Sequence, residues 1–245
     1  MTTLLERPSK AATGKTRPPY RLTAILVGLF FIIGTAAGVG SAIAGNSILT
    51  SANPVAEAVS SPNQLIAGGV LVLVMGLPLA MIPILMYPLF RRYNEVLAMG
   101  AVLFRGILEA VAYLALALSM FLIATVGTGL AAAETESWSV ALLGFNDWIE
   151  VLLAIVFSLG AILLGWLFYK TEIIPRWLAI WGLGGAALYF VAPFIVMFDI
   201  HNLELSLTTG IGLLLAPLAI QEMVFAVWVL VKGFRQEAVE KLVAS

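Results

Sequence analysis

The feature that most constrains this chain is a series of six apolar segments, each longer than about 20 residues. That is the length a helix needs to cross the hydrocarbon core of a bilayer, which is about 30 Å thick. A helix also satisfies all backbone hydrogen bonds within one segment, which lipid requires. We therefore predict an all-α, polytopic membrane protein with six transmembrane helices. The segments are Leu22–Ala44, Gln64–Phe90, Val96–Ala124, Phe145–Tyr169, Trp177–Phe198 and Thr208–Val231.

The composition supports a membrane protein and excludes several other classes. Charged residues make up 11% of the chain, whereas a soluble domain has about 25%. The mean hydropathy is +1.03, so the lipid bilayer is the expected partner. A net charge of −1 gives no indication of a nucleic acid partner. The chain has no cysteine, which excludes disulfides and thiolate chemistry.

Lysines and arginines predict the orientation of the segments. With six spans, twelve of the 13 basic residues fall on one side of the membrane, and the loops on the other side carry acidic residues but no lysine or arginine. Basic loops stay in the cytoplasm, so we expect both termini there. Residues 1–21 would then be a disordered basic tail, 22–232 the bundle and 233–245 a short C-terminal tail. The twelve residues are Arg7, Lys10, Lys15, Arg17, Arg21, Arg91, Arg92, Lys170, Arg176, Lys232, Arg235 and Lys241.

A secretory signal at the start of the chain is the competing interpretation of the first segment. Ala42, Ile43 and Ala44 resemble a small-residue cleavage site. The apolar run before them is about twice as long as the core of a usual signal, and cleavage would leave five spans. We therefore favour an uncleaved first helix.

The thirteenth basic residue, Arg105, lies inside the third segment with Glu109 four residues later. A central arginine costs about 2.5–3.5 kcal/mol on insertion scales, so it needs a partner. At 1.5 Å per residue, Arg105 and Glu222 of the sixth segment both lie ~14 Å from the cytoplasmic face. We predict an Arg105–Glu222 ion pair with Gln221 nearby, and the spacing also permits a pair between Arg105 and Glu109. Because guanidinium matches carboxylate and phosphate, an anionic small molecule or lipid near Arg105 is one expected ligand.

Glu150 completes the predicted polar centre. It follows Asp147 at what we expect to be the start of the fourth helix, where the helix dipole stabilises a carboxylate. A stripe of small residues follows it and is a candidate polar route towards Glu109, formed by Ala154, Ser158, Ala161 and Gly165. His201 lies near two acidic residues in an outer loop, but one histidine does not make a metal site. We therefore expect neither a metal nor a cofactor.

Three stretches together resemble a known family: "FRGILEAV", "LLGWLFYKTEIIPRWLAIWGLGG" and "QEMVFAVWVLVKG". They are similar to the domain of unknown function 4386 family of bacterial integral membrane proteins. The matching residues are Arg105 and Glu109, Pro175 and Arg176, then Glu222, Trp228, Lys232 and Gly233. The resemblance implies a compact multi-span bundle in the inner membrane. It brings no activity, and no catalytic residue is carried over from it.

Three kinds of function remain open. Intramembrane ionisable residues commonly mark substrate or ion paths, which favours binding or transport of a small molecule, lipid or proton. A satisfied Arg–Glu pair can instead be structural, in a non-catalytic membrane subunit or regulator that belongs to an oligomer or complex. Two buried carboxylates could also act as acid and base on a lipid or isoprenoid. HExxH and GxSxG motifs are absent, which makes the enzyme the weakest of the three.

Overall fold

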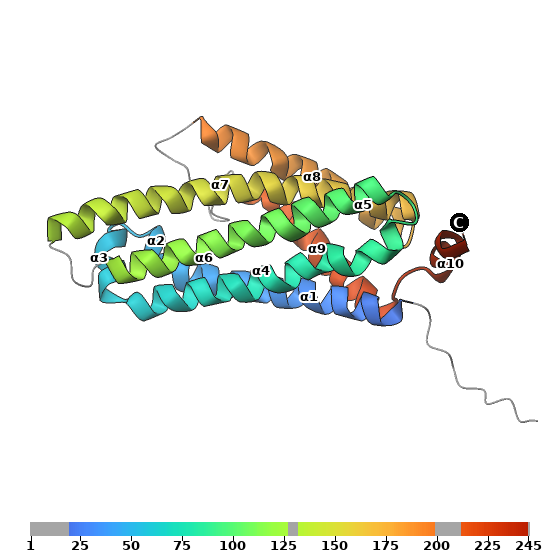
Figure 1. The fold of residues 1–245 in the computed structure, drawn as a ribbon, viewed down its shortest axis with the longest axis horizontal. Coiled ribbons are helices and arrows are strands. Elements are labelled where there is room, and N and C mark those ends of the chain that lie inside the picture. Colours follow the sequence, from blue (N-terminus) through green and yellow to red (C-terminus); the bar gives the residue numbers. More distant parts are fainter. Residues whose placement is uncertain (1–19, 127–131, 199–211, 245) are drawn as a thin grey trace, which may run out of the picture.

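The computed structural model describes residues 20–126, 132–198 and 212–244, and within these ranges it contains helices and no strands (Figure 1). The predicted tail up to residue 19 and His201 lie outside the described residues. The helices are α1 (Arg21–Ser41), the π-helix η1 (Ala42–Asn46), α2 (Ser47–Leu49), α3 (Pro54–Ser60), α4 (Pro62–Phe90), α5 (Glu95–Ala101), the π-helix η2 (Val102–Leu108), α6 (Glu109–Val126), α7 (Ala132–Thr171), α8 (Arg176–Met197), the 3₁₀-helix η3 (Gly212–Leu215), α9 (Ala216–Val231) and α10 (Gln236–Ala244).

Six helical stretches of the described chain are long and apolar enough to cross a membrane, which confirms the predicted fold class. The first of them continues past Ala44 to Leu49, and the fourth begins well before Phe145. Helix α7 has 40 residues and is therefore about 60 Å long. It contains no proline, so nothing in its sequence interrupts the backbone hydrogen bonds before the apolar part begins.

The six spans form a closed ring in which each packs mainly against two neighbours. The order around the ring is α1, α4, α6, α7, α8 and α9, and α9 returns to α1. Helix α5 and η2 precede α6 in the third span and contact α4 and α7. Glycines permit the closest approaches, and a Cβ on Gly68 of α4 would lie 2.8 Å from the Cα of Gly45. A ring of this kind places a column of side chains along its axis.

The basic residues of the described chain gather at one end of the ring, the right-hand end of Figure 1, where α1 begins and α4, α7 and α9 end. The Arg21 guanidinium donates hydrogen bonds to the carbonyls of Val229 and Leu230 at the end of α9. Arg92 donates to the Val243 carbonyl of α10. Of the described basic residues, only Arg105 lies within the ring. The predicted segregation of charge is therefore seen in the fold.

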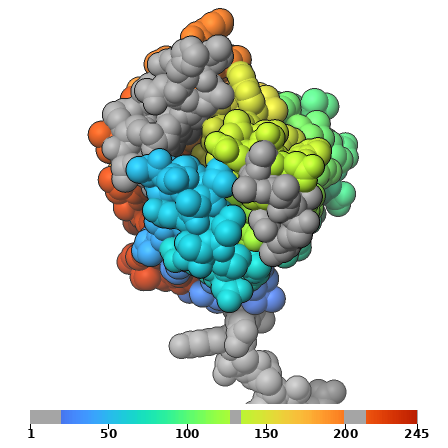
Figure 2. Space-filling model, turned by 90° about the vertical axis from the view of Figure 1, so that its left-hand side faces the viewer, coloured from blue at the N-terminus to red at the C-terminus, as the bar shows by residue number. Residues whose placement is uncertain are grey.

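Residues 236–244 lie in the short tail predicted after residue 232. They form α10, which lies at the basic end and buries Val239. The segment is amphipathic, because Val239 and Leu242 are three residues apart and share one face. The chain reaches it through a turn in which the Arg235 amide donates to the Ile173 carbonyl. Figure 2 shows the opposite end of the ring, where α3 and the start of α7 lie side by side.

Candidate functional site

The middle of the bundle holds a cluster of three ionisable side chains, Arg105, Glu109 and Glu222. Nη1 of Arg105 lies 3.2 and 3.1 Å from Oε1 and Oε2 of Glu109. Its Nη2 lies 2.6 Å from Oε1 of Glu222. The side chains of Arg105 and Glu109 are each 1% exposed, and that of Glu222 is 16% exposed. The Arg105–Glu222 pair predicted between the third and sixth spans is confirmed, and the pair within the third span forms as well.

The π-helix η2 explains how the third span presents these groups on one face. Four of the buried positions in and around η2 follow one another at intervals of four residues: Ala101, Arg105, Glu109 and Tyr113. Four residues exceed the 3.6 of an α-helical turn, so such positions drift around a regular helix. The wider turn of a π-helix corrects part of this drift. Turns of this type occur frequently at functional sites.

Two residues of α7 hold Arg105 from the side. A Cβ atom on Gly160 would lie 2.8 Å from the backbone nitrogen of Arg105 and 2.9 Å from its Cα, so only glycine permits this approach. One turn earlier, the ring of Phe157 has its centroid 4.1 Å from Cζ of Arg105. A desolvated cation–π contact of this kind is worth about 2 kcal/mol. The guanidinium is therefore enclosed by α6, α7 and α9.

The cluster contains more negative than positive formal charge. One guanidinium faces two carboxylates, which leaves a formal charge of minus one. Both terminal nitrogens of Arg105 already contact a carboxylate. An anionic ligand near Arg105 would share the guanidinium with these two carboxylates. A proton or another cation, in contrast, would balance the charge of the cluster.

Gln221 lies near the cluster, as predicted, but it bonds elsewhere. It lines a small cavity of about 30 Å³ together with Arg105 and Glu222. Its Nε2 donates a 3.0 Å hydrogen bond to the Leu178 carbonyl of α8. A Cβ on Gly182, in the next turn of α8, would meet the Gln221 amide at 3.0 Å. The side chain of Gln221 thus joins α8 to α9.

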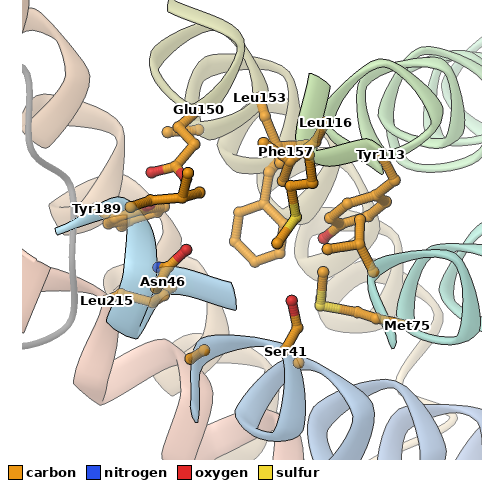
Figure 3. A pocket seen from close by; sticks show the side chains of 16 residues that line it. Ser41, Asn46, Met75, Tyr113, Leu116, Glu150, Leu153, Phe157, Tyr189 and Leu215 are labelled. Carbon is orange, nitrogen blue, oxygen red and sulfur yellow. The ribbon is translucent and has the colours of Figure 1, made fainter. Parts of the chain in front are cut away.

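A larger cavity of about 220 Å³ lies inside the bundle, towards the end that carries α2 and α3 (Figure 3). Eleven of its sixteen lining residues are apolar. The other five bring hydroxyl, amide and carboxylate groups from α1, η1, α6, α7 and α8, namely Ser41, Asn46, Tyr113, Glu150 and Tyr189. In Figure 3, Ser41 and Met75 point into the space from one side and Phe157 and Tyr113 from the other.

Glu150 lines this cavity, at the start of the predicted route towards Glu109. The prediction that it opens the fourth helix is wrong, because α7 begins at Ala132 and places Glu150 several turns inside. The helix dipole acts only in the first turn, so it does not account for this carboxylate. Glu150 is half-buried and accepts a 3.3 Å hydrogen bond from Asn146. Asn146 in turn accepts one from Ser119 of α6, at 2.6 Å.

Two aromatic side chains separate the cavity from the ion cluster. Phe157 lines the cavity and stacks on Arg105, and Tyr113 lines the cavity and follows Glu109 by one helical turn. Small residues of the predicted route along α7 line both cavities: Ala154 lines the larger one, and Ala161 and Gly165 line the small one beside Arg105. Ser158 is buried, and its hydroxyl donates to the Ala154 carbonyl of its own helix at 2.7 Å. Glu150 and Tyr113 line the same cavity, and Tyr113 follows Glu109 by one helical turn.

The aromatic members of the site were missed from the sequence. Phe157 and Tyr189 form an edge-to-face pair at 5.9 Å between α7 and α8. In a chain this rich in apolar residues, their sequence context does not distinguish them from lipid-facing aromatic residues. Tyr113 carried a usable signal, because it continues the four-residue series of Arg105 and Glu109. The described residues contain no group of three or more metal-ligating side chains.

A family model described as "Domain of unknown function (DUF4386)" matches residues 26–233, which include the cavity and the ion cluster. No curated protein and no solved structure matches the chain.

Proposed function

Since the chain belongs to the DUF4386 family, whose function is unknown, we propose a role from the geometry of the chain itself. This multi-pass membrane protein binds a small molecule inside its bundle and carries it across the membrane. One observation carries the proposal: the cavity of about 220 Å³ shares a wall with a buried ion cluster. Ligand sites are typically largely apolar cavities with a few polar groups converging on them. This cavity has that composition.

The shared wall couples the two parts of the site. An occupant of the cavity touches Phe157 and Tyr113. The Phe157 ring stacks on Arg105, and Tyr113 follows Glu109 by one helical turn. A change in occupancy therefore alters the packing around the ion cluster. The cluster joins α6 to α9, two helices that are not neighbours in the ring. Movement of one against the other is the kind of rearrangement that transport requires.

Two measurements test this function: the identity of molecules that are bound to the purified protein, and the efflux of these molecules. Small molecules extracted from the purified protein are identified by mass spectrometry, and their efflux from proteoliposomes is then measured. Ala154→Phe fills the cavity from α7 and should abolish both signals, and Ala42→Leu fills it from η1. Ala36→Phe is the matched control, because Ala36 is exposed to lipid. Equal recovery and flux from wild type and both filled variants would refute the proposal.

Isosteric changes in the cluster test its part in transport. Glu109→Gln and Glu222→Gln each remove one formal charge with little change in shape. We expect both variants to bind the resident molecule and to lose most of its efflux. Wild-type efflux from both would remove the carboxylates from the mechanism and leave only a binding cavity.

A second candidate function has its own supporting observation. Arg105 contacts both carboxylates and the Phe157 ring, and a cluster satisfied in this way can serve only to hold helices together in a membrane subunit or regulator. A variant with Arg105→Met, Glu109→Leu and Glu222→Leu distinguishes the two candidates. If it folds and still carries the resident molecule, the cluster is structural.

We also propose that the basic end of the bundle faces the cytoplasm and that the protein lies in a bacterial inner membrane. The gathering of the described lysines and arginines at that end supports this orientation. The cavity then lies in the half of the bundle nearer the outer surface.

A further inference from the structure

We propose that the cavity selects small organic cations, with an ammonium group beside Glu150 and an apolar body among the aromatic and aliphatic side chains. This inference rests on the proposed binding function and names the class of ligand. Among the described residues, Glu150 is the only ionisable carboxylate in the lining, and no lysine or arginine lines the cavity. An ammonium group in this space therefore meets negative formal charge.

The aromatic lining favours the same charge. Tyr113, Phe157 and Tyr189 all border the cavity. The face of an aromatic ring is electron-rich and attracts a cation within about 6 Å of its centroid. The Phe157 ring is shared with Arg105 at 4.1 Å, so the two tyrosines are the rings available to a ligand. Carboxylate and aromatic faces together are a common environment for ammonium groups.

The ion cluster behind the wall adds to this preference. Its one guanidinium and two carboxylates leave a formal charge of minus one behind Phe157 and Tyr113. Electrostatic interactions extend further in a low-dielectric interior than in water. A cation in the cavity is therefore attracted both by Glu150 and by the ion cluster, and an anion is repelled by both. The remaining lining is largely aliphatic, which matches an apolar body and disfavours a bare hydrated metal ion.

Three probes of the same shape and different charge test the inference: 2-phenylethylammonium, 2-phenylethanol and phenylacetate. Binding to the full-length protein in phosphatidylcholine nanodiscs is measured by calorimetry, with empty nanodiscs subtracted. We expect the ammonium probe to bind at least about tenfold more tightly than the alcohol, and phenylacetate to bind more weakly than either. Ala154→Phe should weaken the binding of all probes if they occupy the cavity.

Glu150→Gln is the decisive variant, because it removes the charge and keeps the shape of the side chain. It should bring the affinity of the ammonium probe close to that of the alcohol. Glu136→Gln is the matched control, since Glu136 lies exposed on the same helix outside the cavity lining, and it should leave the preference unchanged.

Each remaining outcome decides against the inference. Equal binding of the three probes, a preference for phenylacetate, or a cation preference that survives Glu150→Gln would overturn it. These results leave the proposed function in place if Ala154→Phe still blocks probe binding. Absence of binding by all three probes also overturns the inference, and the proposed function is then judged separately from the resident molecule and its efflux.

Discussion

Removal of Arg105 should destabilise the protein far more than removal of either acid that it contacts. Arg105→Met leaves two carboxylates facing each other in the bundle, and loss of one partner from a buried ion pair costs about 3–5 kcal/mol. Glu222→Gln keeps an oxygen where Oε1 now lies 2.6 Å from Arg105. It also leaves Arg105 and Glu109 in formal balance. The difference between a charged and a neutral hydrogen bond is about 1–2 kcal/mol, which is our estimate for this variant.

The free energy of unfolding in lipid bicelles, measured by steric trapping, checks this order. The variant with Arg105→Met and Glu222→Leu should remain destabilised, because Glu109 then lies buried without its cation. Adding Glu109→Leu should restore the stability to within about 1 kcal/mol of wild type, since apolar replacement of a whole buried ion cluster is often neutral or stabilising. A loss in Glu222→Gln as large as that in Arg105→Met would refute the charge balance inferred for the cluster.

Three further predictions concern packing and orientation. Gly160→Ala should lower the thermal midpoint of the detergent-solubilised protein by the equivalent of about 1–3 kcal/mol, because the new Cβ meets the Arg105 backbone at 2.8 Å. Gly144→Ala, on the same helix with nothing within 4 Å of the new atom, should be neutral or stabilising. Gln221→Met loses the hydrogen bond to α8 and should cost about 1 kcal/mol in the same assay; an unchanged midpoint would contradict that role. Because the chain has no cysteine, single introduced cysteines report its orientation. In right-side-out vesicles, an impermeant maleimide should label Trp138→Cys and should not label Arg92→Cys. The reverse labelling would show that the orientation is opposite to the one proposed.

Most of the fold could be predicted from two physical requirements of the bilayer, a minimum apolar length and basic residues on one side. These requirements located the six spans. These requirements do not predict helical structure outside the lipid. The residues before Phe145 are polar enough to resemble a loop, and α7 nevertheless extends through them because no proline or cap ends it. For the same reason α10 was not predicted, because a polar segment of nine residues does not fit the pattern of a transmembrane span.

Part of the candidate site could be predicted because buried charge demands partners. Arg105 had to meet an acid at its own depth, and that reasoning identified Glu222. Glu150 was placed wrongly at the start of the fourth helix, because the sequence before Phe145 does not show that α7 begins at Ala132. The cavity could not be predicted, because a space between helices depends on their packing. Its wall is made by Tyr113 and Phe157, which carry no charge to reveal them.

The π-helical turn before Glu109 has a consequence for the whole of α6. Each residue of an α-helix advances the chain by about 100° around the axis. A π-helical turn absorbs one additional residue, so that residue does not rotate the helix that follows. If residues 102–108 formed a regular α-helix instead, every later side chain would turn by this angle, and Glu109 and Tyr113 would turn away from their partners. Deleting a single residue between Val102 and Leu108 would remove the π-turn and leave α6 facing the bundle as it does now. The π-helical turn therefore keeps the two halves of the third span in register.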